Sequence, residues 1–252
     1  FDKFLQELSA ISPAIPVLII AGNHDNAQRL DYASSFLEKH QIYLSVSAPA
    51  QQEEHLKKVV LHDMHGEVHF YLLPFLKPGY VRQLFAEGVV HDYESAVREI
   101  LRREEIDYGK RNVLLSHQFY TNGGQAPERC ESEQLVISLG GLENVDASVV
   151  EKFDYVALGH IHGAQMVKFP HIRYCGTPLK YSVSEERHKK SITMVTLEAK
   201  GTQAVIETIP LTPFQDVRKV RGLLREVIEK ATDENRHDFL SVTLTDEKEP
   251  YH

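Results

Sequence analysis

The chain has 252 residues, of which 42% are hydrophobic and 25% charged, so it is long enough for one sizeable core and a smaller second unit. Its formal net charge of −8 argues against a clamp that grips nucleic acid by electrostatics alone, since such a clamp needs many basic contacts to phosphate. Two cysteines are too few for a disulfide framework, and no apolar run reaches the ~20 residues of a membrane span. We therefore expect a cytoplasmic protein without a membrane segment.

Helix-like and strand-like hydrophobic patterns alternate along the first half of the chain. Helices are predicted at 1–11, about 27–40, 78–86 and 93–105, and strands at 16–21, 42–46, 58–63 and 68–73, the last two forming a hairpin. This alternation favours an α/β fold with mixed β-sheets flanked by helices. Beyond two strands that end in histidines, the patterns at 165–169, 172–175, 192–197 and 204–209 predict antiparallel sheet.

A boundary is predicted near Pro210-Leu211-Thr212-Pro213. Beyond it, the apolar residues from Phe214 to Ala231 have the spacing of one face of a helix. Residues 239–244 have the pattern of a strand that packs with this helix. The expected domains are therefore 1–210 and 211–252, the second being the beginning of a small α+β unit. Because the chain opens on a helical pattern without methionine and stops eight residues after its last predicted strand, we expect truncation at both ends.

Three predicted strands end in side chains of the kinds that bind metals. They run into Gly22-Asn23-His24-Asp25, Ser116-His117 and Gly159-His160-Ile161-His162. Because α/β sheets place their chemistry at the carboxyl ends of their strands, these side chains are expected to converge. Imidazole nitrogen with amide and carboxylate oxygen suits Mn, Fe, Zn or Co. The two histidines of the last string either share a face or diverge toward two ions.

Each of these residues has a structural alternative. Asp25 is interpreted as the N-cap of the following helix. Asn23 is interpreted as a ligand rather than a turn residue, because the histidines need an oxygen donor at the same edge. His117 becomes a candidate only through its place at a strand end. His160 and His162 are the strongest candidates, because glycine gives the backbone freedom on both sides of them.

In order and spacing, the three strings resemble the last three signatures of the calcineurin-like metallophosphoesterases. The stretches 153–163 and 174–182 resemble more narrowly the SbcD-type nuclease subunits of that family, and the resemblance covers nearly the whole chain. It implies a layered metallophosphoesterase sandwich with a capping domain after residue 210. The family's first two signatures, an Asp-x-His string on the first strand and a Gly-Asp-x-x-Asp string on the second, are missing from these places: the one Asp-x-His string, Asp63-Met64-His65, lies in the predicted hairpin, and Gly-Asp-x-x-Asp does not occur. We therefore expect this chain to lack the bridging carboxylate and most ligands of the first metal.

The resemblance also implies residue roles. Asn23, His117 and His160 would bind a second divalent ion and His162 the first, while His24 would be catalytic, facing the substrate phosphate. Two ions, Mn by resemblance with Mg, Fe or Zn as alternatives, would hydrolyse the phosphodiester by a two-metal mechanism. The basic run near 180–190 is either a solvated face or a DNA contact. The DNA-contacting residues expected there are Lys180, Tyr181, Ser182 and Arg187.

The function implied is that of a double-strand 3′–5′ exonuclease and hairpin or single-strand endonuclease in DNA repair, recombination and replication. The implied partners are DNA, an SbcC-type coiled-coil ATPase and a second nuclease subunit in a heterotetramer. Two alternatives stay open: another calcineurin-like phosphoesterase or phosphatase, and a non-catalytic scaffold. Without the upstream ligands, this chain alone is expected to bind one ion weakly and to cleave DNA poorly.

Overall fold

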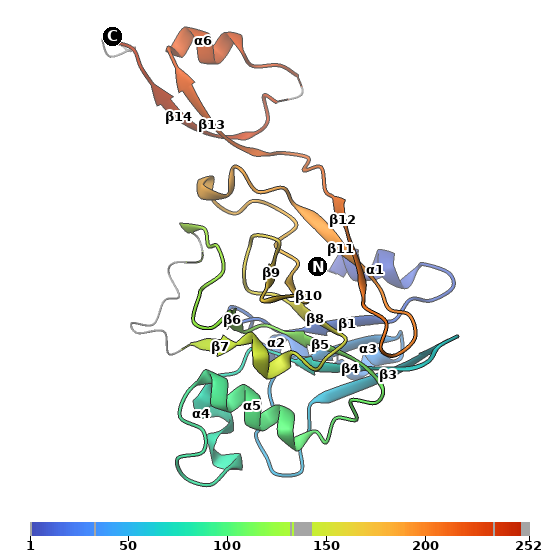
Figure 1. Ribbon diagram of the computed structural model, residues 1–252. Coiled ribbons are helices and arrows are strands. Elements are labelled where there is room, and N and C mark those ends of the chain that lie inside the picture. The colour runs from blue at the N-terminus through green and yellow to red at the C-terminus, as the bar shows by residue number, and fades with distance from the viewer. Residues whose placement is uncertain (1, 33, 132, 134–142, 234, 248–252) are drawn as a thin grey trace.

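The computed structural model describes residues 2–32, 34–131, 133, 143–233 and 235–247 (Figure 1). Its main body is a six-stranded sheet. The strands lie in the order β3 (Lys57–Asp63), β4 (Gly66–Leu73), β5 (Arg111–Ser116), β8 (Tyr155–Leu158), β10 (Phe169–Tyr174) and β9 (Gln165–Val167). The inner pairs are parallel and the two outer pairs are antiparallel. The predicted α/β fold with a mixed sheet is therefore confirmed.

One face of this sheet packs against helices. The main helix, α5 (Tyr93–Arg103), begins with a capping box in which the Asp92 carboxylate accepts a hydrogen bond from the Ser95 main-chain nitrogen at 2.7 Å. Its predicted apolar stripe is buried in the large core: Ala96, Val97, Ile100 and Leu101. The same core also contains residues of α4 (Pro78–Val81) and of the 3-10 turns η1 (Arg82–Leu84) and η3 (Ala147–Val150). This packing explains why the helical period is visible in the sequence.

The opposite face carries a smaller apolar cluster. Val68, Val113 and Tyr155 project from three neighbouring strands, and they pack against side chains of a hairpin that crosses the sheet. That hairpin consists of β11 (Ser191–Thr196) and β12 (Val205–Pro210) in antiparallel register. Arg111 joins the two layers, because its buried guanidinium donates to Asp63 and to the carbonyl oxygen of Glu198 at 3.2 Å.

The amino-terminal region forms a separate small sheet. Helix α1 (Asp2–Ser9) leads to β1 (Val17–Ile20), which pairs in parallel with β2 (Ile42–Ser45). Between them, the single helix expected at 27–40 is two short helices, α2 (Ala27–Asp31) and α3 (Ser34–Glu38), and residue 33 lies outside the described residues. A further parallel pair is β6 (Phe119–Thr121) with β7 (Asn144–Asp146).

Two predictions about the second half of the chain are corrected by the structure. The strands at 165–175 are antiparallel to each other, but β10 also pairs in parallel with β8 and so extends the main sheet. The helix expected between 214 and 231 is α6 (Leu224–Glu229) alone. Its first half is instead strand β13 (Val217–Gly222), paired in parallel with β14 (Phe239–Leu244). Pairing with a distant strand overrode the local period.

The unit formed by β13, α6 and β14 lies at the top of Figure 1, away from the six-stranded sheet. It contacts the main body through the turn η4 (Val183–Glu185) and its neighbours. Lys180 forms an ion pair with Asp216 at 2.9 Å, and the Lys219 main-chain nitrogen donates to Glu186. The division into domains at residue 210 stays a prediction. Within the described ranges, no helix is long and apolar enough to cross a membrane.

Candidate metal centre

The polar ends of three strands meet in one cavity of about 160 Å³. Asn23 and His24 follow β1, His117 follows β5, and His160 and His162 follow β8. Strands β5 and β8 are adjacent and parallel, so their last residues reach the same edge of the sheet. Asp25, Glu133 and Thr177 complete the polar lining of this cavity.

Three of the predicted ligands lie close together. His117 Nε2 is 3.1 Å from Asn23 Oδ1, and the rings of His117 and His160 have centroids 5.2 Å apart at a steep angle. Phe75 and Phe119 flank these rings, with centroids 6.4 Å and 6.1 Å from that of His160. The convergence expected from strand order is therefore present. The assignment of these residues as metal ligands stays a prediction.

The His117 ring lies in a slot between two glycines. A Cβ atom on Gly22 would lie 2.8 Å from His117 Nε2, and one on Gly159 would lie 2.7 Å from His117 Nδ1. Side chains do not tolerate such distances, so only glycine lets the two backbones approach the ring this closely. Gly22 of the first motif string and Gly159 of the third therefore both make room for His117 of the second.

The loop after β5 is anchored from behind. The buried hydroxyl of Tyr174 accepts a hydrogen bond from the Tyr120 main-chain nitrogen at 2.7 Å and donates to the Gln118 carbonyl oxygen at 2.9 Å. Ser116 Oγ lies 3.1 Å from the Tyr120 hydroxyl. These buried bonds fix the backbone on both sides of His117.

The two central histidines are held in their neutral form. Burial lowers the pKa of His117 to about 3, with His160 and His24 adding repulsion, and burial lowers the pKa of His160 to about 4. At neutral pH each ring therefore keeps a free nitrogen lone pair, which a metal ligand needs. With the Asn23 amide oxygen, this nitrogen and oxygen donor set fits Mn, Fe, Zn or Co. His160 also has φ of 99°, a strained conformation that is typical of functional sites.

The lowered pKa values predict a pH dependence of stability in the metal-free protein. Since both lie below the ordinary imidazole pKa of ~6.5, the unfolded chain takes up these protons first as the pH falls. Each site should therefore lower the free energy of unfolding by up to about 1.4 kcal/mol per pH unit between pH ~6.5 and ~4, and have no effect above pH ~7.5.

Urea unfolding in EDTA at several pH values measures this effect. A His117→Gln/His160→Gln variant is the control, and its stability should fall less steeply over the same range. Parallel curves for the parent and the variant would show that the two imidazoles are not desolvated.

The other two residues of the first string differ from each other. His24 is exposed and lines the rim of the cavity. Asp25 is not the N-cap of the following helix, as the sequence predicted. Its carboxylate accepts a hydrogen bond from the Gly22 main-chain nitrogen at 2.7 Å. This bond stabilises the turn formed by residues 22–25. The cap is Asn26, which accepts from the Arg29 main-chain nitrogen at 3.1 Å.

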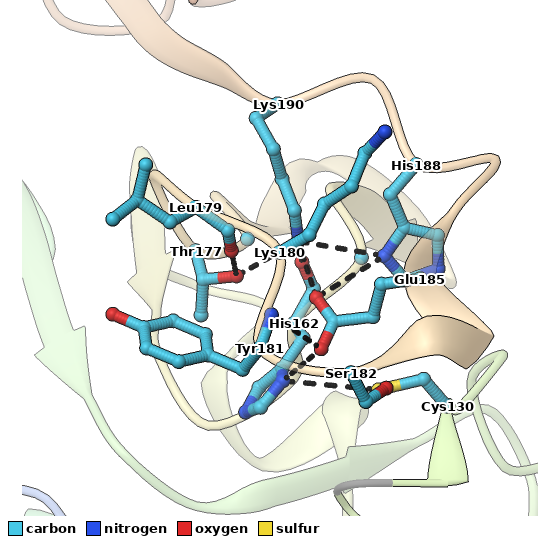
Figure 2. Close-up of polar contacts among 12 residues, drawn as sticks. Cys130, His162, Thr177, Leu179, Lys180, Tyr181, Ser182, Glu185, His188 and Lys190 are labelled. Carbon is cyan, nitrogen blue, oxygen red and sulfur yellow. Dashed lines mark hydrogen bonds and ion pairs between the residues drawn. The ribbon is translucent and has the colours of Figure 1, made fainter. Parts of the chain in front are cut away.

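His162 lines the same cavity but has its own set of partners (Figure 2). Its Nδ1 is 3.1 Å from Glu185 Oε1 and 3.7 Å from Cys130 Sγ. Its main-chain nitrogen donates to the Glu133 carboxylate. Sequence reasoning assigned no site role to Cys130, Glu133 or Glu185. The available signal was Glu185, a carboxylate three residues after the stretch 174–182 that resembles the SbcD-type nucleases.

The residues expected to contact DNA fall into two groups. Lys180 bonds inside the protein to Asp216 and to the Glu186 carbonyl oxygen. Lys190, which belongs to the same basic run but not to the four expected contacts, bonds to Glu185. Tyr181 is 62% exposed, with its ring centroid 5.7 Å from that of His162, and Arg187 is also exposed. Ser182 Oγ bonds to Ser184 Oγ at 2.5 Å.

Comparison with known proteins points to one kind of relative, although no family model matches the sequence. The SbcD subunit of the nuclease SbcCD from Staphylococcus epidermidis is 29% identical over 235 residues, which are 92% of this chain and 59% of that protein. The corresponding SbcD subunit from Staphylococcus saprophyticus is 29% identical over 239 residues, covering 92% of this chain and 58% of the relative. This chain thus spans less than two thirds of the length of either. In its sequence and its mixed α/β sheet, the chain is similar to the SbcD-type metallophosphoesterases, as its motifs predicted.

Proposed function

We propose that this chain is the core of a metal-dependent DNA nuclease subunit of the SbcCD type. One observation carries the proposal: His117 and His160 follow the adjacent strands β5 and β8, Asn23 reaches them from β1, and the three side chains offer neutral nitrogen and oxygen donors in one cavity. The similarity to two nuclease subunits over 92% of the chain supports the same conclusion.

Each residue of the centre has a distinct part in this proposal. Divalent ions bound here would supply Lewis-acid polarisation of the phosphate and activation of water. Asn23, His117 and His160 would hold the second ion, and His162 would contribute to the first. His24, exposed at the rim, would hydrogen-bond the phosphate and give a proton to the leaving oxygen. The phenylalanines beside the rings keep the donors dehydrated and neutral.

The substrate in this proposal is DNA, cut as a double-strand 3′–5′ exonuclease and as a hairpin or single-strand endonuclease. Tyr181 offers an exposed ring beside His162 on which a base can stack, and Arg187 offers a cation for the phosphate backbone. With a net charge of −8, the protein would rely on such local contacts and on its metals. The proposed partner is an SbcC-type coiled-coil ATPase in a heterotetramer with two nuclease subunits, acting in cytoplasmic DNA repair, recombination and replication with Mn as the metal.

A nuclease assay with and without Mn²⁺ tests the proposal. The full-length protein should degrade linear duplex DNA and open hairpin DNA only with the metal. The 252-residue chain should do so poorly, because neither of the family's first two signatures precedes its Gly-Asn-His-Asp string and the first ion's site is then short of ligands. A His160→Ala variant of the full-length protein is the control for a contaminating nuclease.

Two outcomes would contradict parts of this proposal. Hydrolysis of a phosphate monoester such as p-nitrophenyl phosphate, without DNA cleavage, would favour a calcineurin-like phosphatase. Robust DNA cleavage by the 252-residue chain would show that its centre is already complete.

A further inference from the structure

Glu185 is a buried carboxylate whose side chain is 0% exposed, and the proposed reaction does not use it directly. We propose that Glu185 is a positioning residue for His162. It fixes the imidazole as the tautomer with the proton on Nδ1, so that the Nε2 lone pair is available to the first metal ion. This inference rests on the proposed function and adds a residue to it.

The hydrogen bond between the two side chains sets the direction of the proton. His162 Nδ1 lies 3.1 Å from Glu185 Oε1, and that oxygen also accepts from the Tyr181 main-chain nitrogen at 3.2 Å (Figure 2). An ionised carboxylate only accepts hydrogen bonds, so Nδ1 must donate. In a neutral imidazole the second nitrogen, Nε2, then carries the lone pair.

The charge of Glu185 is balanced by Lys190. Lys190 Nζ lies 2.6 Å from Glu185 Oε2, and its side chain is 4% exposed. The same ammonium donates to Thr177 Oγ1 at 2.8 Å and to the His162 carbonyl oxygen at 3.0 Å. The ion pair therefore holds both the ring and the main chain of His162. A buried carboxylate without such a partner would take up a proton and lose its capacity as a pure acceptor.

The same contacts make Glu185 a support for the centre rather than a ligand. Donor atoms of Cys130, His162 and Glu185 lie within 4.8 Å of one another, a spacing that a metal ion can bridge. However, the ammonium of Lys190 already contacts this carboxylate, and a divalent cation beside it would be repelled. A carboxylate that orients a histidine ligand through its second nitrogen usually changes metal affinity by about 10- to 100-fold.

A matched pair of variants separates this role from simple packing. Both carry Lys190→Met, which removes the cation, and they differ only in Glu185→Gln or Glu185→Met. Glutamine and methionine have similar size, and replacing a buried ion pair by neutral side chains is often tolerated. Only glutamine keeps an oxygen that can accept the Nδ1 proton.

Two measurements on the full-length protein follow. Mn²⁺ binding by calorimetry should be within about 3-fold of the parent in the glutamine variant, and about 10- to 100-fold weaker in the methionine variant. Nitrogen NMR of ¹⁵N-histidine protein without metal should show the Nδ1–H tautomer of His162 in the parent and the glutamine variant, and a mixture in the methionine variant. A His162→Gln variant identifies the signals. Glu186→Gln is the neighbouring control, since that carboxylate bonds to the Lys219 main-chain nitrogen instead.

The results that would overturn the inference are specific. An Nε2–H tautomer in the parent contradicts it without any variant, even if both double variants fail to fold. Equal Mn²⁺ affinities of the two double variants contradict it as well. If the parent binds no Mn²⁺, the proposed function fails, whereas the tautomer of His162 still tests the role of Glu185.

Discussion

In the full-length protein, His117→Ala is expected to remove most metal from the second site and nearly all activity. The substitution deletes an imidazole held between Gly22 and Gly159, 3.1 Å from Asn23 Oδ1, and leaves a gap among dehydrated groups. His24→Ala should instead leave the metal content nearly intact and lower the rate by about 100- to 10,000-fold, the usual range for a positioned acid or base. His24 differs in this way because it lies exposed at the rim of the cavity.

Metal stoichiometry and turnover on the same DNA, measured for both variants, decide between these roles. His91→Ala is a suitable control, because that exposed histidine lies outside the cavity and should change neither quantity. Equal loss of metal in the two site variants would mean that His24 is a ligand and that the roles assigned here are mistaken.

Gly159→Ala should disable the centre while leaving the fold intact. The added Cβ would stand 2.7 Å from His117 Nδ1 and 3.3 Å from its Cε1, so it would overlap the ring. The ring must therefore leave its slot, which moves Nε2 away from Asn23. We expect Mn²⁺ affinity to fall at least about 10-fold, which corresponds to ~1.4 kcal/mol.

Gly79→Ala is the matched control for this substitution. Gly79 lies in α4 with no atom within 4 Å of its added Cβ, so alanine there should leave both metal binding and activity unchanged. Thermal unfolding of both variants shows whether the loss is local. Unchanged Mn²⁺ affinity in Gly159→Ala would indicate that the His117 ring has room to move and that the slot is not required.

The sequence by itself determined the elements whose pattern is local. The stripe of α5 and the β3–β4 hairpin were predicted within a few residues, because a buried helix face and a tight turn leave their period in neighbouring positions. The grouping of His117 with His160 was also predictable, because both follow adjacent parallel strands and so meet at one edge of the sheet. Asn23 joins them from β1 of the separate two-stranded sheet, a placement that depends on the packing of the two sheets.

Only the tertiary structure decided features that depend on pairing between distant segments. The stretch from Val217 to Gly222 had the apolar spacing of a helix, but hydrogen bonds to a strand 22 residues later made it β13. Lys180 and Lys190 had the appearance of solvated basic residues. Burial of their side chains turned them into internal ion-pair partners of Asp216 and Glu185.

The contacts that hold His162 in place were also decided only by the tertiary structure. Glu185 and Cys130 come from segments 23 and 32 residues away from this histidine, and no local period connects them. The sequence therefore determined which side chains gather at the edge of the sheet. The fold determined which of them face the cavity, which are desolvated and which hold another in place, because those properties arise from burial and contact between segments far apart in the chain.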